Sequence, residues 1–222
     1  MTLWVVKLGG SLANTGELPR WLDVIATTGG GKVVLVPGGG PWADEVREAQ
    51  EREGFDDRVA HRKALRAMEE YGRVLSKMRN NIVPAVDVAE IHEALGNGQV
   101  AVWMPFAMVV ADPSIPESWD VTSDSLAVWL AKQLGASALL LVKSLKIGRP
   151  APCIEDLMDR GWVDAAFANF AAGVQLPIVL AGQGDQKPVE RMLTEAASAM
   201  ATGPESKESQ EQGPYAIASR ST

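Results

Sequence analysis

The stretch Leu3-Trp4-Val5-Val6-Lys7-Leu8-Gly9-Gly10-Ser11 combines an apolar run, a lysine and two glycines. Residues 3–6 are continuously apolar, which is typical of a strand buried on both faces of a parallel sheet. Gly9 and Gly10 let the backbone approach a ligand and direct N–H groups at an anion, and Lys7 adds a cation at the same strand end. The plain alternative is a strand with a glycine turn and Lys7 in solvent. Short glycine motifs are weak signals, so this stretch alone does not separate the two interpretations.

A second glycine cluster favours the anion-binding interpretation. Residues 32–37 are predicted to form another buried strand, which runs into Gly38-Gly39-Gly40-Pro41. Pro41 suits the first position of a helix, and a helix N-terminus is a natural anion site. The cluster matches neither a Walker loop nor the dinucleotide-binding fingerprint. Two such strand ends, close in sequence, suggest that two phosphate groups face each other.

Composition and charge exclude several classes of function. The 222 residues are 46% hydrophobic and 22% charged, as in an ordinary globular protein. A net charge of -7 argues against nucleic acid as a partner. Two histidines and the single Cys153 make a zinc site unexpected and exclude an internal disulfide. The chain starts directly with a strand, and no apolar run approaches the roughly 20 residues of a membrane span. We therefore expect a cytoplasmic protein with no membrane partner.

Further strands and helices alternate along the chain. Apolar periodicity predicts one α/β domain over residues 1–201, followed by a polar, disordered tail over 202–222. The predicted helices cover residues 17–28, 55–79, 86–96, 122–134, 155–161, 162–173 and 187–200. Further strands are predicted at 100–104 and 106–110, separated by Pro105, and at 138–142 and 177–181.

The predicted helix at 55–79 carries much positive charge. Its basic residues are His61, Arg62, Lys63, Arg66, Arg73, Lys77 and Arg79. One interpretation is a solvated helix face. The other is a basic surface turned toward an anionic substrate held by the glycines at 38–40, with His61 as the residue that touches it.

The segment Val121-Thr122-Ser123-Asp124-Ser125-Leu126-Ala127 is predicted to start a helix. Thr122 or Ser123 can cap this helix, which places Asp124 in its first turn. The helix dipole favours the ionised carboxylate there, so Asp124 is expected to accept hydrogen bonds and to orient a lysine or a metal ion. The plain alternative is an aspartate that only stabilises the helix.

Three of these motifs together resemble the amino acid kinase superfamily. They are Lys7-Leu8-Gly9-Gly10-Ser11, Gly38-Gly39-Gly40 and Thr122-Ser123-Asp124-Ser125, and they occur in this order at similar distances. The resemblance covers about residues 1–200 and implies a three-layer αβα sandwich around a mainly parallel sheet. Residues 116–125 look like the branch that phosphorylates [5-(aminomethyl)furan-3-yl]methyl phosphate in methanofuran or methylofuran biosynthesis. Other members include acetylglutamate, aspartate, uridylate and isopentenyl phosphate kinases.

The resemblance implies a role for each motif. It suggests ATP-dependent transfer to a small phosphorylated acceptor, with Mg²⁺ held mainly by the ATP phosphates, and a homo-oligomer. The N-terminal part would bind the acceptor and the C-terminal part the nucleotide. The implied catalytic residues are Lys7, Asp124 and Lys143; those for ATP are Gly9, Gly10, Ser11, Ser144, Lys146 and Gly148; those for the acceptor are Gly38, Gly39, Gly40, His61, Thr122 and Ser123.

One departure from the family concerns a second lysine. The family usually has one in the C-terminal half, but the corresponding stretch here reads Phe167-Ala168-Asn169-Phe170. Either Lys143 or Lys146 supplies this charge, or the protein is a weak kinase, or a binding or regulatory subunit in the same pathway. A kinase for another phosphate or carboxylate acceptor is a further alternative. Lys143 directly follows a buried strand, so we predict that it points into the nucleotide pocket.

Overall fold

A computed structural model describes residues 2–148, 152–198 and 215–216. Its centre is a sheet in the order β3 (Ile82–Ala85), β4 (Val100–Trp103), β2 (Val33–Pro37), β1 (Trp4–Leu8), β5 (Ala138–Val142), β6 (Ile178–Ala181) and β7 (Tyr215–Ala216). Strands β1 to β6 pair in parallel, and β7 pairs antiparallel with β6. The prediction of a mainly parallel sheet is confirmed.

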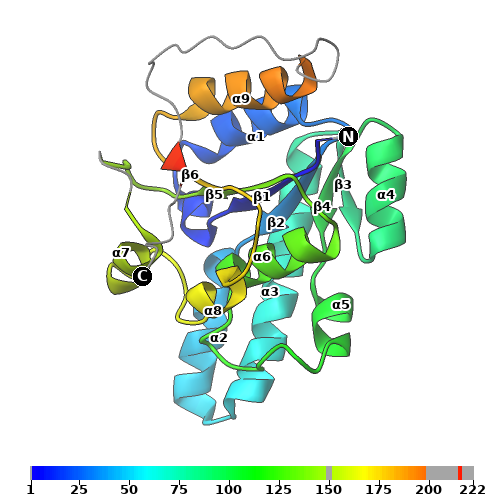
Figure 1. Ribbon diagram of the computed structural model, residues 1–222. Helices are drawn as coiled ribbons and strands as arrows, with labels where there is room; N and C mark the ends of the chain where they lie inside the picture. The colour runs from blue at the N-terminus through cyan, green and yellow to red at the C-terminus, as the bar shows by residue number, and fades with distance from the viewer. Residues whose placement is uncertain (1, 149–151, 199–214, 217–222) are drawn as a thin grey trace.

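Helices cover both faces of this sheet (Figure 1). Helices α1 (Leu18–Thr28) and α9 (Gln186–Ser198) lie side by side on one face, whereas α6 (Ser123–Gln133) and α8 (Phe167–Ala171) lie on the other. This arrangement confirms the expected three-layer sandwich. The remaining helices are the 3-10 helix η1 (Gly10–Asn14), α2 (Gly40–Glu53), α3 (Asp57–Met78), α4 (Val88–Gly96), α5 (Phe106–Ala111) and α7 (Ile154–Asp159).

Strand alternation determines which side chains face α6. In β1 and β5, Val5, Leu139 and Leu141 belong to the same core cluster as α6, and the residues between them pack with α1 and α9. Successive side chains of a strand point to opposite faces. Lys7 is two residues after Val5 and Lys143 is two after Leu141, so both lysines lie on the α6 face. Because β1 and β5 are neighbours in the sheet, the two lysines also lie close together.

One strand prediction was wrong, and one strand was missed. Residues 106–110 form part of helix α5, which starts after Pro105; the Phe106 N–H donates to the buried Glu69 carboxylate at 3.2 Å. The capping residue lies 37 residues earlier in the chain, so the apolar sequence at 106–110 gives no indication of it. Strand β3 was not expected, because it is short and contains Pro84. It lies at an edge of the sheet, where a proline is tolerated.

The C-terminal part differs from prediction in detail. Helices α7 and α8 are shorter than expected, and residues 160–166 between them are not helical. Within the predicted tail, Tyr215–Ala216 form β7, and the rest of 202–222 lies outside the described residues. No helix in the described part of the chain has the length and hydropathy needed to cross a membrane.

Candidate functional site

Two buried lysines share one carboxylate at the carboxyl ends of β1 and β5. The Lys7 Nζ lies 2.9 Å from Asp124 Oδ1, and the Lys143 Nζ lies 2.7 Å from the same oxygen. The exposed fractions of Lys7, Asp124 and Lys143 are 4%, 6% and 7%. The structure therefore brings together the three residues expected to be catalytic. The group carries an excess of one positive charge when all three are ionised.

Burial and mutual attraction both act on these three charges. Burial favours the neutral acid of Asp124, but the two lysines outweigh this effect and hold its pKa below the usual range. Burial, together with repulsion from Lys7, lowers the pKa of Lys143 from 10.5 to about 8, against the attraction of Asp124. Asp124 is thus an ionised acceptor, and Lys143 gives up its proton more readily than an ordinary lysine.

The first turn of α6, which carries Asp124, is fixed by Asp164. Thr122 is the N-cap residue, as expected, but its side chain does not cap the helix. One oxygen of Asp164 accepts from the N–H of Thr122 at 2.9 Å, from its Oγ1 at 2.8 Å and from the N–H of Ser125 at 3.0 Å. The other oxygen accepts from the hydroxyl of Ser125. Sequence reasoning missed Asp164, since it lies about 40 residues from its partners in an irregular segment.

The two glycine loops pack directly against each other. The Gly38 N–H donates to the Leu8 carbonyl at 2.9 Å, and a Cβ at Gly10 would come within 2.6 Å of the Gly40 nitrogen. Gly40 also has a positive φ of 57°, which favours glycine. A Cβ at Gly39 would overlap the Cβ of Ala43 in α2. The close approach that these glycines allow is therefore partly between the loops and α2, in addition to any contact with a ligand.

A cavity of about 270 Å³ opens beside this group. Lys7 and Asp124 lie at its wall, together with the expected ligand-binding residues Gly10, Ser11, Gly39, Gly40, His61, Thr122 and Ser123. Its other lining residues are Asn14, Pro41, Ala43, Asp44, Arg47, Ala64, Leu65, Met68, Trp119, Val121 and Leu126. Gly9 and Gly38 do not line it. The structure thus gathers most of the expected acceptor residues around one cavity.

Trp119 forms part of this cavity and is held from two sides. Its Nε1 donates to Gln50 Oε1 at 2.7 Å, and the Arg47 guanidinium carbon lies 4.4 Å from its ring centroid. Both contacts come from α2. They attach the loop before α6 to the α2–α3 pair.

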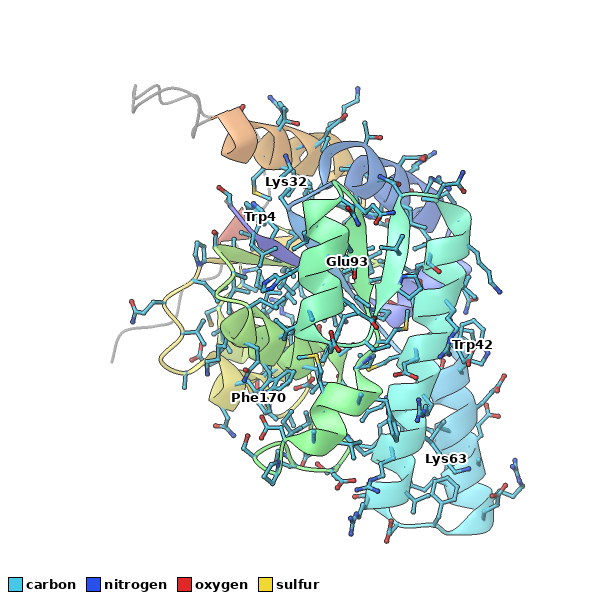
Figure 2. The ribbon with its side chains drawn as sticks, turned by 90° about the vertical axis from the view of Figure 1, so that its right-hand side faces the viewer. Trp4, Lys32, Trp42, Lys63, Glu93 and Phe170 are labelled. Carbon is cyan, nitrogen blue, oxygen red and sulfur yellow. The ribbon has the colours of Figure 1, made fainter. Side chains whose placement is uncertain are left out.

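The basic residues of α3 do not form a free cationic surface at the cavity. Arg62 donates to Glu117 at 2.6 and 3.1 Å, and Arg66 and Arg73 pair with acidic residues of α3 itself. Lys63 is exposed beside Phe55, toward the far end of the α2–α3 pair and distant from Lys32 (Figure 2). The α3 residues at the cavity are His61, Ala64, Leu65 and Met68. The solvated-face interpretation therefore holds for Arg66, Arg73 and Lys63, whereas Arg62 is half-buried against the loop before α6.

The residues expected to bind nucleotide follow the neighbouring strands β1 and β5. The hydroxyls of Ser144 and Ser11 are 2.8 Å apart, which joins the loops after β5 and β1. Gln183, after β6, donates to the Ser144 carbonyl at 2.7 Å. Lys146 and Gly148 are exposed and do not line the cavity. Of the two lysines considered as the missing cation, only Lys143 reaches Asp124.

Comparison with known proteins agrees with this architecture. The sequence is 26% identical over 139 residues to the [5-(aminomethyl)furan-3-yl]methyl phosphate kinase of Methanocaldococcus jannaschii. That match covers 62% of this chain and 63% of the relative's length. The fold is similar to the crystal structures of uridylate kinase from Archaeoglobus fulgidus (TM-score 0.64, 17% identity, covering 86% of this chain and 95% of that one) and UMP kinase from Ureaplasma parvum (0.61, 15%, 87% and 95%). At these identities the structural likeness concerns the fold alone.

The family itself is identified from the sequence profile. The profile of the Amino acid kinase family matches residues 2–146, which is more than half of the chain. This range contains Lys7, Asp124 and Lys143 as well as both glycine loops. The chain therefore belongs to the amino acid kinase family.

Proposed function

We propose that this protein is an ATP-dependent kinase that transfers the γ-phosphoryl group to a small phosphorylated acceptor. The observation that carries the proposal is the arrangement of Lys7 and Lys143 around Asp124 beside a cavity of small-molecule size. Phosphoryl transfer needs alignment and positive charge on the equatorial oxygens more than it needs covalent chemistry from the protein. Two buried ammonium groups, oriented by one carboxylate, supply that charge.

In the proposed reaction, an oxygen of the acceptor phosphate attacks the γ-phosphorus, and the bond between this phosphorus and the oxygen of ADP breaks. No general base is needed, because a phosphate monoester already carries an anionic oxygen near neutral pH. Lys7 and Lys143 hold the transferring group. Asp124 fixes both Nζ atoms and stays ionised, so it acts as an orienting acceptor and not as an acid.

Nucleotide would bind on the β5 side and the acceptor in the cavity. We assign Gly9, Gly10, Ser11 and the loop of Ser144, Lys146 and Gly148 to ATP. Gly38, Gly39, Gly40, His61, Thr122 and Ser123 are assigned to the acceptor. We propose that Mg²⁺ is held mainly by the ATP phosphates. Such a bound Mg²⁺ neutralises phosphate charge. A homo-oligomer remains part of the proposal.

For the acceptor we propose [5-(aminomethyl)furan-3-yl]methyl phosphate, an intermediate of methanofuran or methylofuran biosynthesis. The support is the relative that carries this substrate in its name and the resemblance of residues 116–125. A different phosphate or carboxylate acceptor, such as a nucleoside monophosphate, is the rival within the same enzyme class.

The other rival is a binding or regulatory subunit that lost the chemistry. It was motivated by the missing lysine at residues 167–170, where Phe167 is buried in the core. The contact of Lys143 with Asp124 weakens this motive, because it places a second cation beside Lys7 from a different part of the chain. The kinase is therefore the better-supported proposal.

The experiment is ADP formation by the purified protein with ATP, Mg²⁺ and single acceptors. The panel contains the furan phosphate, UMP, isopentenyl phosphate, aspartate and acetylglutamate. We expect the furan phosphate to give the highest kcat/KM, and Lys7→Met to lower it by about 10²-fold or more. Lys77→Met is the matched control, since this lysine of α3 is exposed and does not line the cavity. Absence of turnover with every acceptor would favour the binding-subunit rival.

A further inference from the structure

His61 has one ring nitrogen that is bonded and one that is not. Its exposed fraction is only 3%, and its Nδ1 lies 3.0 Å from the Ser118 carbonyl oxygen. A carbonyl oxygen can only accept, so Nδ1 carries the hydrogen. Burial lowers the pKa of His61, and the neutral ring therefore presents a lone pair at Nε2. In the described structure this buried Nε2 has no hydrogen-bond partner.

The Ser118 carbonyl that fixes the ring is itself held in place. On one side of it, Glu117 accepts two hydrogen bonds from Arg62 and lies 3.4 Å from Arg58. On the other side, Trp119 is tied to α2 through Gln50. The orientation of His61 is thus preorganised, and its Nε2 stays an acceptor.

The environment of the ring suggests what Nε2 binds. The ring lines the cavity whose wall also carries Lys7, and the apolar residues of the same wall include Ala64, Leu65 and Val121. A buried acceptor without a partner is unfavourable, and native proteins usually satisfy it with water or a ligand. Phosphate oxygens are themselves acceptors, so they are not suitable partners for a lone pair. A neutral His61 is not a cation for an anionic substrate, in contrast to one of the two interpretations of the basic residues that the sequence left open.

We propose that His61 determines acceptor specificity by accepting, through Nε2, a hydrogen bond from an N–H or O–H group on the substrate. The substrate class is a phosphomonoester with an apolar body and a hydrogen-bond donor at the end away from its phosphate. The inference rests on the proposed function, because that function places the acceptor in this cavity. It adds which end of the acceptor the protein recognises, and it names Nε2 of His61 as the atom that makes the contact.

The test measures binding without ATP, by calorimetry on the full-length protein. The probes are [5-(aminomethyl)furan-3-yl]methyl phosphate, its 5-hydroxymethyl analogue and its 5-methyl analogue, which lacks the donor. We expect the wild type to bind both donor-bearing compounds about 10–100-fold more tightly than the methyl analogue. A loss of this size follows when a buried acceptor is left unpaired.

Two substitutions of His61 separate its nitrogens. His61→Asn keeps a donor for the Ser118 carbonyl and removes the Nε2 acceptor, so we expect the preference to fall to about threefold or less, with the affinity for the methyl analogue nearly unchanged. The longer side chain in His61→Gln can place an acceptor oxygen near the position of Nε2, so we expect this variant to keep part of the preference. His92→Asn, in the other and exposed histidine, is the matched control and leaves the preference intact.

The possible failures can be told apart. If the wild type shows no preference, if His61→Asn keeps it, or if no compound binds at millimolar concentration, the inference is overturned. Turnover of the methyl and aminomethyl compounds at equal kcat/KM would leave the kinase proposal standing and remove this one. A preference that depends on His61, in a protein that forms no ADP, would support the inference and refute the kinase proposal.

Discussion

Replacing Lys143 by methionine tests two expected effects of its buried charge: a lower stability of the fold and a higher rate of turnover. Lys143 is 7% exposed, and its pKa falls from 10.5 to about 8 in the folded protein. At about 1.4 kcal/mol for each pH unit, keeping this lysine charged at pH 7 costs the folded state about 3 kcal/mol. Lys143→Met removes that cost and fills similar space, while Asp124 keeps its ion pair with Lys7.

The loss of the hydrogen bond between Lys143 and Asp124 offsets part of this gain. Such a charge-assisted bond contributes about 1.5–3 kcal/mol, much of which the lowered pKa of Lys143 already includes. We therefore expect the variant to be about 1–2 kcal/mol more stable than the wild type at pH 7, which corresponds to a rise in Tm of about 2–8 °C for a chain of this size. Its turnover should fall about 10²–10³-fold, because one cation at the transferring phosphoryl group is lost.

The stability difference should also depend on pH in a defined direction. Below about pH 8 Lys143 is charged in the folded protein, which is destabilised by the full amount. Between about pH 8 and 10.5 the unfolded chain binds more protons at this position than the folded protein, so the wild type becomes more stable relative to the variant as the pH rises. Urea denaturation at pH 7 and pH 9.5 measures this change, with Lys146→Met as the exposed control. A variant that is less stable than the wild type at pH 7, by an amount unchanged at pH 9.5, would refute the reasoning.

Three further outcomes follow from the same contacts. Asp164→Asn should lower the free energy of unfolding by about 1–3 kcal/mol, because an amide cannot accept four hydrogen bonds; a urea midpoint equal to that of the wild type would contradict this. Burial lowers the pKa of His61, so the free energy of unfolding should fall with decreasing pH below about 6.5, by at most about 1.4 kcal/mol per pH unit from this group. The slope should flatten in His61→Gln, and identical pH profiles of the variant and the wild type would exclude a contribution of His61. Gly39→Ala should destabilise by about 1–3 kcal/mol through overlap with Ala43, whereas Gly16→Ala, which meets no atom, should be neutral in thermal melts.

The grouping of Lys7, Asp124 and Lys143 was largely predictable from the sequence, because its signals are local. Lys7 follows an apolar strand and precedes two glycines, and Asp124 lies in the first turn of a helix. Both patterns identify a charged residue and its position, at the end of a strand for Lys7 and at the start of a helix for Asp124. Lys143 was recognised in the same way, as the residue after a buried strand. Its contact with Asp124 follows once β5 is known to pair with β1 in parallel.

The residues that hold the site together were not predictable in this way. Asp164 is in an irregular segment, and only the folded chain brings it to Thr122. Glu69 caps α5 from another helix, which is why an apolar run at 106–110 was interpreted as a strand. In both cases one carboxylate satisfies backbone N–H groups far away in sequence. Local periodicity carries no information about such partners.

The sharing of one carboxylate by two lysines explains why the site costs stability. If Lys7 and Lys143 each had their own carboxylate, the group would be neutral and would attract a phosphoryl group only weakly. With Asp124 alone, both Nζ atoms are drawn to the same oxygen and one positive charge is left over in a buried place. That charge is unfavourable until an anion arrives, and it then becomes the source of binding. The lowered pKa of Lys143 and the proposed affinity for a transferring phosphoryl group would therefore be two consequences of the same arrangement, and a substitution that relieves the first should weaken the second.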